Sequence, residues 1–346
     1  MRTVKELIIK GKRVLVRCDF KVPIDKDGTI LDDFKIRSTI PTIQYLVEAG
    51  AKIILMSHLG EPAGKVVDRF RLDRVQENLL QYLDLSVIKA KDCIGRDIES
   101  WTKQMRPGEI LLLENLRFHP EEEKGDLAFT KKLVRLGDIF LNDAFASSHR
   151  NHASFKVAKY LPCGAGLLLD KEVRALNKIK DNPDSPLVVI LAGLPKGIKT
   201  KIKFINSFID RADFILLGNL VTNELQKHGF QFGLSGKIVV SLDSNQGLDI
   251  GPETIKIFKQ KILGAKTIFW SGPLGKIENK EFSLGTREII KAIIKSQAFS
   301  VAGGGETSWF INQLGLETKF SHLSTGGDAL LVFLSGEKMP GIEMLD

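Results

Sequence analysis

Hydrophobic residues form short continuous runs along the chain, separated by longer stretches in which apolar and polar positions mix. Short runs of β-branched and aliphatic residues are typical of strands buried on both faces of a parallel sheet. We predict such strands at 14–16, 53–55, 110–113 and 139–141 in the first half, and at 187–191, 214–217, 238–240, 267–270 and 298–301 in the second.

The stretches between these runs carry apolar residues at helical spacing. Ile43, Leu46 and Val47 share one helical face, as do Ile202, Ile205 and Ile209. Strands that alternate with helices along the whole chain indicate an α/β protein built on doubly wound, Rossmann-like parallel sheets.

Two prolines with turn-forming neighbours interrupt the pattern at 181–186, and the charged segment 171–180 before them is predicted to be one helix. A chain of 346 residues also exceeds the usual size of a single core. We therefore expect two doubly wound domains joined by a helix.

The composition, 43% hydrophobic and 27% charged, is typical of a globular protein, but the formal net charge is +8. Binding of nucleic acid, binding of small anions and a lysine-rich proteome would each explain the excess. Basic residues are spread along the chain and aromatic residues do not interleave with them. This distribution favours a small anionic substrate and no nucleic-acid partner.

The cysteines, Cys18, Cys93 and Cys163, are few, odd in number and far apart. Their spacing argues against a disulfide framework or a zinc knuckle and is typical of a reducing compartment. No apolar run reaches the ~20 residues that span a bilayer, and no apolar leader follows Met1. We expect a cytoplasmic protein without a membrane partner.

Basic residues and histidines follow each of the first four predicted strands. Ligands of parallel sheets bind beyond the carboxyl ends of the strands, whereas an ordinary solvated surface would scatter such residues over both ends. The pattern therefore favours an anion pocket. His149 and His152 have the i, i+3 spacing of a metal pair, but no carboxylate or cysteine completes it, and His119 before Pro120 is predicted to lie in a turn.

The apolar run 298–302 leads directly into Gly303, Gly304, Gly305, Glu306 and Thr307, with a helix predicted from about Ser308. Glycines let backbone N–H groups approach an anion, and a helix start adds a positive dipole end. Glu306 would hold Mg²⁺ directly or through water, and Thr307 would donate to a phosphate oxygen. The alternative is a tight turn without a ligand.

Two further glycine-rich segments follow predicted strands, at 192–201 and 269–278. The first contains Lys196 and Lys201 but lacks the order of a Walker A motif, so it suggests phosphate contacts of another kind. No Gly-x-Gly-x-x-Gly opens a helix after a strand, which weakens a dehydrogenase interpretation.

Taken together, these segments resemble the phosphoglycerate kinase family. Their order and spacing hold over essentially the whole chain, which is somewhat shorter than usual for the family. The resemblance is carried by 17–23 (RCDFKVP), 32–37 (DDFKIR), 41–43 (PTI), 57–60 (SHLG), 112–119 (LLENLRFH), 142–145 (NDAF), 248–252 (LDIGP), 270–273 (WSGP), 303–305 (GGG) and 324–327 (STGG).

The resemblance implies reversible phosphoryl transfer from 1,3-bisphosphoglycerate to ADP, with Mg²⁺, giving 3-phosphoglycerate and ATP. It implies a substrate domain at 1–168 completed by about 331–346, an inter-domain helix at 169–182 that serves as a hinge, and a nucleotide-binding domain at 183–330. It also implies a glycolytic enzyme that is a monomer.

Site residues carry over by position. The implied catalytic residues are Lys35, Lys201, Gly304 and Gly305. The implied substrate contacts are Asp19, Phe20, Lys21, Lys35, His58, Leu59, Gly60, Glu61, Arg117 and Arg150. The implied nucleotide contacts are Lys196, Lys201, Glu278, Gly303, Gly304, Gly305, Glu306 and Thr307, with Glu306 reaching Mg²⁺ through the nucleotide.

Several positions depart from the family pattern. Lys21 stands where the family has Asn, Lys35 where it has the arginine credited with stabilising the transferring phosphoryl group, and Glu61 where it has Arg. In the other domain, Glu306 replaces Asp, and Asp328 replaces Gly. An alternative function is therefore a weak or inactive paralogue that binds nucleotide and has a regulatory or interaction role. Because Lys21 and Glu61 change in opposite senses at neighbouring strand ends, we predict that they pair.

Overall fold

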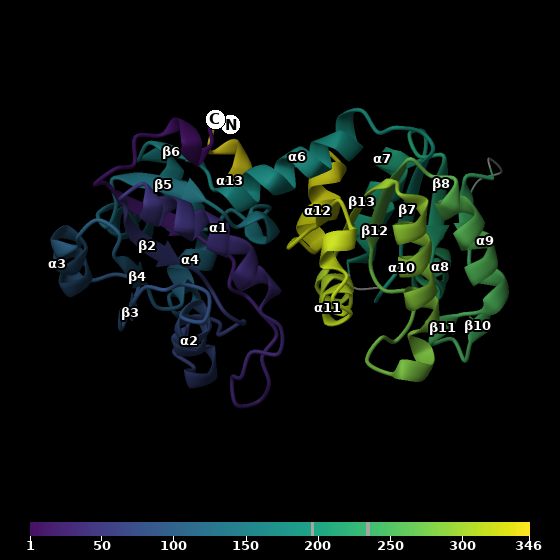
Figure 1. Cartoon of the computed structure of the whole chain (residues 1–346), viewed down its shortest axis with the longest axis horizontal. Coiled ribbons are helices and arrows are strands. Elements are labelled where there is room, and N and C mark those ends of the chain that lie inside the picture. The colour runs from purple at the N-terminus through teal and green to yellow at the C-terminus, as the bar shows by residue number, and fades with distance from the viewer. Residues whose placement is uncertain (195–196, 233–235) are drawn as a thin grey trace. The chain divides into compact units, whose positions relative to one another are not determined.

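The computed structural model describes residues 1–194, 197–232 and 236–346 (Figure 1). The chain divides into two compact units: unit 1 comprises Met1–Lys171 and Lys338–Asp346, and unit 2 comprises Glu172–Glu337. The last segment of unit 1 follows unit 2 in the chain, and the helix at 328–334 belongs to unit 2.

Unit 1 contains a six-stranded parallel sheet with the strand order β3-β4-β2-β1-β5-β6. The strands are β1 (Arg13–Arg17), β2 (Lys52–Met56), β3 (Val87–Lys89), β4 (Ile110–Leu112), β5 (Ile139–Asn142) and β6 (Cys163–Ala165). The α-helices are α1 (Phe34–Glu48), α2 (Asp73–Leu79), α3 (Arg96–Gln104), α4 (Pro120–Lys124), α5 (Leu127–Val134) and α13 (Pro340–Glu343).

Side chains on one face of this sheet form a single core with α1 and α2. Val14 and Val16 of β1 point to that face, whereas Leu15 between them points to the other. Ile36 and Ile43 of α1 are fully buried against the same core, because residues seven apart lie on one face of a helix. Burial of both sheet faces explains why the strand sequences are continuously apolar.

Unit 2 contains a second six-stranded parallel sheet, with the order β14-β13-β12-β7-β8-β9, and a two-stranded antiparallel pair, β10 with β11. The strands are β7 (Leu187–Leu191), β8 (Phe214–Leu217), β9 (Ile238–Val240), β10 (Ser244–Asn245), β11 (Asp249–Ile250), β12 (Thr267–Ser271), β13 (Phe299–Gly303) and β14 (His322–Leu323). The α-helices are α7 (Ile198–Phe208), α8 (Asn219–Lys227), α9 (Pro252–Leu263), α10 (Leu284–Ser296), α11 (Gly305–Gln313) and α12 (Asp328–Leu334).

The fold class predicted from the hydrophobic pattern, α/β with two doubly wound parallel sheets, is confirmed. Every predicted strand is present. The short strands β3, β6, β10, β11 and β14 were not predicted, because none of them contains three consecutive aliphatic or β-branched residues. The connecting helix α6 spans Leu167–Asp181 and is longer at its start than the charged segment that indicated it.

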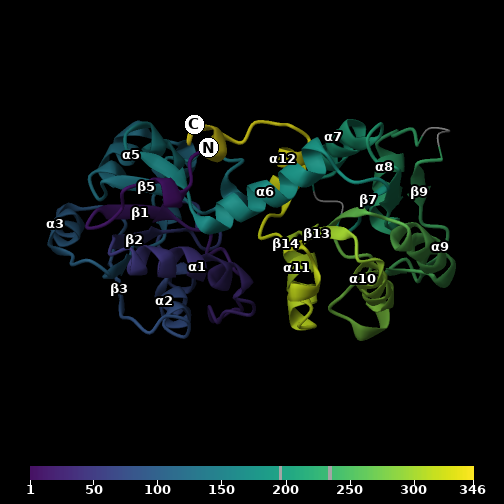
Figure 2. The same cartoon turned by 45° about the horizontal axis from the view of Figure 1, so that its top comes forward.

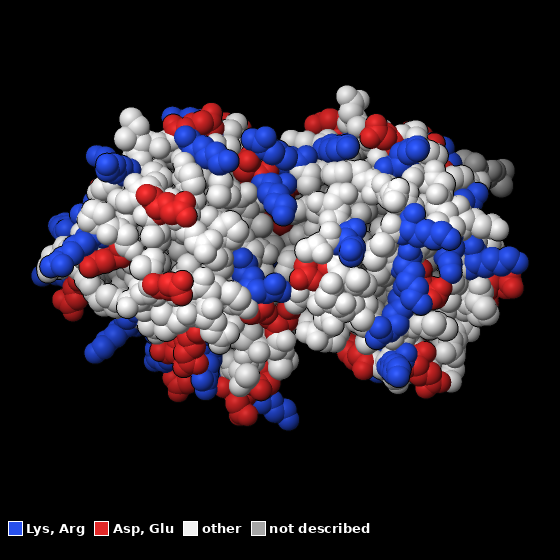
Figure 3. Space-filling model, in the orientation of Figure 1, with Lys and Arg blue, Asp and Glu red and all other residues white. Residues whose placement is uncertain are grey.

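The two ends of the chain lie side by side in unit 1, next to α13 (Figures 1 and 2). On the face seen in Figure 3, acidic and basic side chains are interspersed, and basic side chains gather in a column over α10. In the described part of the chain, none of the helices combines the length and the apolar character needed to cross a bilayer.

Candidate functional site

The candidate site in unit 1 lies at the carboxyl ends of four adjacent strands. In the sheet order, β4, β2, β1 and β5 are consecutive, so the loops that follow them share one edge. These loops carry Asp19 to Lys21, His58 to Glu61, Arg117 and Arg150. The sheet thus brings together residues that lie up to 131 positions apart (Asp19 to Arg150) in the sequence.

Asp19 and Phe20 follow β1 directly, and both are buried. The Phe20 N–H donates to the Ser57 hydroxyl at 2.8 Å, which joins the first two loops. Lys35, from the first turn of α1, places its Nζ 3.4 Å from Asp19 Oδ1. Burial alone would raise the pKa of Asp19, but the charges of Lys35 and Arg17 hold it below its usual value. Asp19 is therefore a carboxylate that fixes the Lys35 ammonium at the strand ends.

Glu61 is the centre of an ion-pair network. It pairs with Lys21, as predicted from the opposite changes at these two positions, and its other oxygen lies 2.6 Å from Arg117 Nη1. Arg117, only 6% exposed, also donates to the Gly60 carbonyl and lies 3.3 Å from Glu123. Burial alone would raise the pKa of Glu61. The hydrogen bonds and charges of Lys21 and Arg117 have the larger combined effect, so the pKa lies below its usual value. The anion-binding face of Arg117 is thus covered by a carboxylate of the same chain.

A buried network that the sequence did not reveal lies beneath this rim. Arg17 Nε donates to the Ser154 hydroxyl at 3.0 Å, and Ser154 donates in turn to Glu122 at 2.6 Å. Glu122 stands between two acidic residues in the sequence, a pattern typical of a solvated turn or of a helix N-terminus. The structure places it in the first turn of α4, fully buried. Pro120 was the one local indication of this helix, because proline is favoured at the first helical position.

His58 is buried and neutral. Burial is the main reason why the pKa of His58 lies well below its usual value, and the positive charges of Arg17 and Arg117 lower it further. Arg17 Nη2 lies 3.1 Å from His58 Nδ1, and because a guanidinium only donates, Nδ1 accepts. The proton of the neutral ring is therefore on Nε2. His58 is a hydrogen-bond donor rather than a base.

Leu59, Gly60 and Arg150 complete the predicted rim. Leu59 is buried, and its carbonyl accepts from Asn115 Nδ2 at 2.8 Å. Gly60 has φ +65°, and a Cβ there would lie 2.3 Å from the Phe70 ring, so no other residue fits without rearrangement. The Arg150 side chain is exposed.

His152, three positions after His149, is buried, and its ring stacks on that of Phe155. Burial, together with the charges of Arg17 and Arg117, lowers the pKa of His152 to about 3. In the unfolded chain this ring binds a proton near pH 6.5, and in the folded chain it does not.

Stability should therefore fall as the pH drops below 6.5, by about 1.4 kcal/mol per pH unit for a group of this kind. We expect urea unfolding to show this loss between pH 7.5 and 5.5, and His152→Gln to reduce it by about 1.4 kcal/mol. The exposed histidine variant His228→Gln is the control and should keep the wild-type slope. An unchanged slope in His152→Gln would contradict a neutral His152.

The candidate site in unit 2 is built on the three glycines after β13. The strand runs through Gly303, and α11 begins at Gly305, three residues before the predicted start. Gly304 between them has φ +103°, a conformation that a side chain disfavours. Thr307 is buried, and its hydroxyl accepts from the Gly272 N–H at 3.0 Å. The free N–H groups of the first turn of α11 form an anion-binding end.

Lys201 reaches this region from the first turns of α7. It is 7% exposed, and its Nζ donates to the carbonyls of Leu194 at 2.7 Å and Ala192 at 3.2 Å. Burial lowers the pKa of Lys201, although Asp328 and Glu306 act in the opposite direction. Lys196, the other lysine predicted here, lies outside the described residues.

Two hollows in unit 2 meet at the glycine loops. One, of about 270 Å³, is lined by Lys201, Gly304, Gly305, Thr307 and Asp328. The other, of about 310 Å³, is lined by the apolar side chains of Leu220, Leu248 and Ile277, with Lys276 and Glu278 beside them. We call the first the polar hollow, after its lysine and carboxylates, and the second the apolar hollow. They share Gly193, Leu194, Pro273 and Glu306. A flat apolar group and a chain of anionic groups would fit side by side, with the anionic part at the start of α11.

Two carboxylates, Glu306 and Asp328, line the polar hollow, and Glu278 lines the adjoining one, so an anion alone would be repelled. Desolvation is the main reason why the pKa of Glu306 is raised, and the negative charge of Glu278 raises it further. Asp328 begins α12 and lines the same hollow as Glu306 and Lys201. Hard oxygen ligands of this kind suit Mg²⁺, and a phosphate-bound Mg²⁺ would remove the repulsion.

Known proteins resemble this chain over nearly its whole length. The family model described as "Phosphoglycerate kinase" matches residues 4–237 and 234–337. Curated proteins named phosphoglycerate kinase are similar over nearly the full length. The protein of Dictyoglomus turgidum is 40% identical over 384 aligned residues, covering 97% of this chain and 96% of the relative. The protein of Moorella thermoacetica is 37% identical over 389 aligned residues, which cover 99% of this chain and 98% of that relative.

Solved structures agree with the sequence comparisons. The crystal structure of the phosphoglycerate kinase from Pyrococcus horikoshii OT3 superposes with a TM-score of 0.90 at 30% identity, covering 100% of this chain and 98% of that one. The structure of the phosphoglycerate kinase from Coxiella burnetii superposes with a TM-score of 0.78 at 31% identity, covering 99% of this chain and 98% of that one. Both sequence alignments are longer than the 346 residues of this chain, so the relatives carry residues that it lacks.

Proposed function

The chain belongs to the phosphoglycerate kinase family and is a phosphotransferase of glycolysis, and from this premise we propose which residues hold each substrate. Unit 1 binds 3-phosphoglycerate or 1,3-bisphosphoglycerate, and unit 2 binds ADP or ATP with Mg²⁺. The phosphoryl group passes directly between the two, and the enzyme acts as a monomer. The adjoining apolar and polar hollows of unit 2 are the observation that carries the nucleotide assignment.

In unit 1 the rim binds the acidic substrate. Arg117 and Arg150 pair with its phosphate, and His58 donates from Nε2 to an oxygen of the substrate. The Lys35 ammonium, held by Asp19, faces the transferring phosphoryl group. Phe20, Lys21, Leu59, Gly60 and Glu61 form the surrounding wall. A transferring phosphoryl group is stabilised mainly by positioned positive charge, which this set supplies.

In unit 2 the base occupies the apolar hollow and Glu278 lies at the ribose. The backbone of Gly303 to Thr307 receives the phosphates, as the start of a helix favours. Lys201 and Lys196 contact the phosphates. Lys201 exchanges its bonds with the Ala192 and Leu194 carbonyls for phosphate oxygens, which turns two neutral acceptors into charged ones.

The residues present fit a magnesium–nucleotide complex. Glu306 and Asp328 line one hollow with a lysine and a helix start, an arrangement in which a cation would neutralise carboxylates and phosphates together. Glu306 would hold the ion directly or through water, and the Asp328 carboxylate lines the same hollow. When bound, Mg²⁺ supplies charge neutralisation at the phosphate oxygens.

Formation of ATP from ADP and 1,3-bisphosphoglycerate, measured in a coupled assay, tests this function. We expect Mg²⁺-dependent turnover. Binding of ADP should be measured on the same preparation, because it reports unit 2 alone. Tight ADP binding without turnover would instead support the second candidate, a weak paralogue.

A specific observation favours that second candidate. The Arg117 guanidinium, the best-placed anion-binding group of unit 1, is occupied by Glu61 and approached by Glu123. Substrate must therefore displace an internal carboxylate. A carboxylate about 4 Å from a substrate charge costs about 1 kcal/mol in water and about 4 kcal/mol at an effective dielectric of 20. Because Glu61 is 61% exposed, its cost lies toward the lower figure.

Replacing Glu61 by Gln should lower the KM for 3-phosphoglycerate by about 10-fold at low ionic strength, because it frees Arg117 and Lys21. The gain should shrink as salt is added, since the site is open to solvent. Steady-state kinetics at two salt concentrations measure it. Glu77→Gln, which removes an exposed partner of Arg74, is the matched control. A KM for Glu61→Gln at or above that of the wild type would show that Glu61 does not compete with substrate.

A further inference from the structure

The loop after β3 and the turn after β4 place three possible metal ligands together. Asp92 and Cys93 lie in the first loop, and His119 is the residue that precedes α4 in the second. Because β3 and β4 are parallel neighbours, their carboxyl ends reach the same edge of the sheet. The spacing of the cysteines gave no indication of this cluster.

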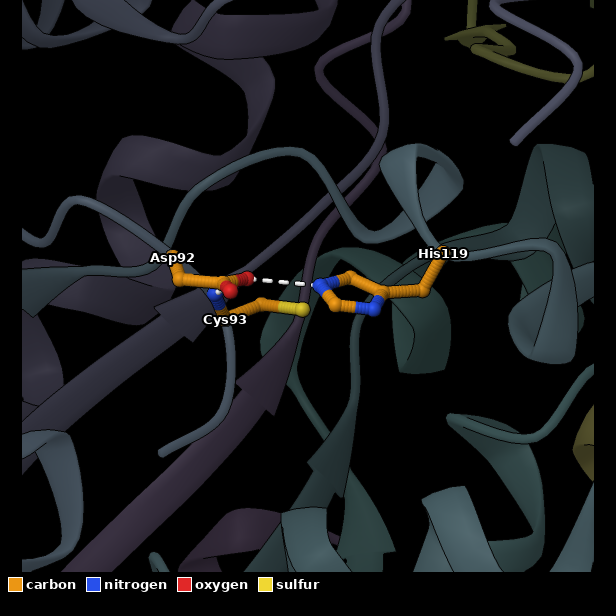
Figure 4. Close-up of side chains that lie close together, drawn as sticks. All are labelled: Asp92, Cys93 and His119. Carbon is orange, nitrogen blue, oxygen red and sulfur yellow. Dashed lines mark hydrogen bonds and ion pairs between the residues drawn. The ribbon is translucent and has the colours of Figure 1, made fainter. Parts of the chain in front are cut away.

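The three side chains point toward one another (Figure 4). His119 Nε2 lies 2.7 Å from Asp92 Oδ1, and the Cys93 sulfur completes a group whose ligand atoms all lie within 4.8 Å of one another. Cys93 is fully buried, Asp92 is exposed, and the His119 side chain is 26% exposed. The cluster therefore has a protein floor and an opening to solvent. Among the described residues no other group of this kind is found.

From this geometry we propose that Asp92, Cys93 and His119 form a zinc site, with water as the fourth ligand. Zinc combines thiolate, imidazole and carboxylate ligands, and three protein ligands with one open position is a common arrangement. A thiolate ligand selects zinc over Mg²⁺, which prefers oxygen alone. The site is separate from the magnesium–nucleotide site, which belongs to unit 2.

The ligand distances fit with a small adjustment. In a tetrahedral site with zinc–ligand bonds of about 2.0–2.3 Å, the ligand atoms lie about 3.3–3.8 Å apart. Asp92 and His119 must separate by less than ~1 Å from their hydrogen-bonded distance, and the thiol must approach by a similar amount. The ion replaces the proton shared by Asp92 and His119, the thiol loses its proton on forming the Zn–S bond, and both protons pass to solvent or buffer.

The surroundings hold two of the ligands in place. The Cys93 N–H donates to Asp92 Oδ1 at 2.6 Å, and the Glu114 N–H donates to the Asp92 carbonyl at 3.3 Å. The His119 ring packs against Phe129 of α5, with centroids 5.3 Å apart. A bound ion would clamp the loop after β3 to the start of α4, and because only the folded chain assembles the three ligands, it would stabilise unit 1.

Cobalt(II) is a suitable probe, because a thiolate ligand gives it a strong charge-transfer absorption. We expect the purified full chain, stripped with a chelator, to bind one Co²⁺ with this absorption, to exchange it for Zn²⁺, and to gain thermal stability with zinc. Cys93→Ser should abolish the absorption and weaken zinc binding by ~100-fold or more, on the scale of lost ligands and their partners. Cys163→Ser, at another mostly buried thiol, should behave as the wild type.

His119→Gln provides a second variant in case Cys93→Ser does not fold, since glutamine can still donate to Asp92. It should retain the fold and lose tight zinc binding. The proposal is overturned if the wild type shows no thiolate–cobalt absorption, or if the absorption persists in Cys93→Ser. It is also overturned if zinc stabilises His119→Gln as much as the wild type, because the cluster would then be only a hydrogen-bonded pair beside a thiol.

Discussion

Replacing Lys35 by Arg should raise kcat by ~10–100-fold, a part of the ~10³–10⁵ that a supplied arginine contributes in other phosphoryl transfers. The Lys35 ammonium is a single point charge that already lies 3.4 Å from Asp19. A guanidinium has five donors in a planar fork, so one edge can keep the Asp19 contact while the other meets the phosphoryl oxygens. The interaction forms mainly in the transition state, so kcat should change more than KM.

Steady-state turnover in the ATP-forming direction measures this effect. Lys10→Arg, an exchange at an exposed lysine, should leave the rate unchanged. Lys35→Met removes the charge and should reduce kcat below the wild-type value. If Lys35→Arg has the wild-type kcat while Lys35→Met is impaired, the lysine is sufficient and the departure from the family pattern does not limit the chemistry.

Lys201→Met should reduce kcat by ~10²–10³, the cost of removing one preorganised donor from a charge-stabilising site. Lys201 is the only cation that the described lining of the polar hollow offers. Its burial means that no water-separated contact replaces it. Because it faces both ground-state and transition-state phosphates, affinity for ADP should weaken as well, by a smaller factor.

Lys203→Met is the matched control, since Lys203 lies on the same helix but is 63% exposed and pairs with Glu337. Lys201→Arg separates charge from structure, because it keeps a donor for the Ala192 and Leu194 carbonyls. Circular dichroism must first show that Lys201→Met has the same fold as the wild type. A correctly folded Lys201→Met with wild-type kcat would rule out a catalytic role.

The two sheets could be predicted from sequence because strands buried on both faces must be apolar along their length, as 187–191 is. The rim of unit 1 could be predicted because side chains after parallel strands share one edge. The pairing of Lys21 with Glu61 followed from charge, and the structure confirms it. The assignment of these residues to particular substrates remains a prediction.

Other features depend on tertiary contacts that no local pattern encodes. The Glu61 contact with Arg117 joins residues 56 apart, and nothing in either segment announces it. Glu122 looks solvent-exposed between two acidic neighbours, and only its place on α4 shows that it faces Arg17. The cluster of Asp92, Cys93 and His119 likewise depends on the adjacency of β3 and β4, and β3 has only two consecutive apolar residues, too few to indicate a strand.

Unit 1 is discontinuous in the chain, which has a consequence for fragments that end early. Its last part, 338–346, follows all of unit 2 in the chain. It supplies the Gly341 carbonyl that accepts from the Asn142 side chain and the Gly341 N–H that donates to the Ser148 carbonyl. A fragment that ends before 338 would therefore contain every strand of the first sheet and still leave the buried Asn142 amide short of one acceptor.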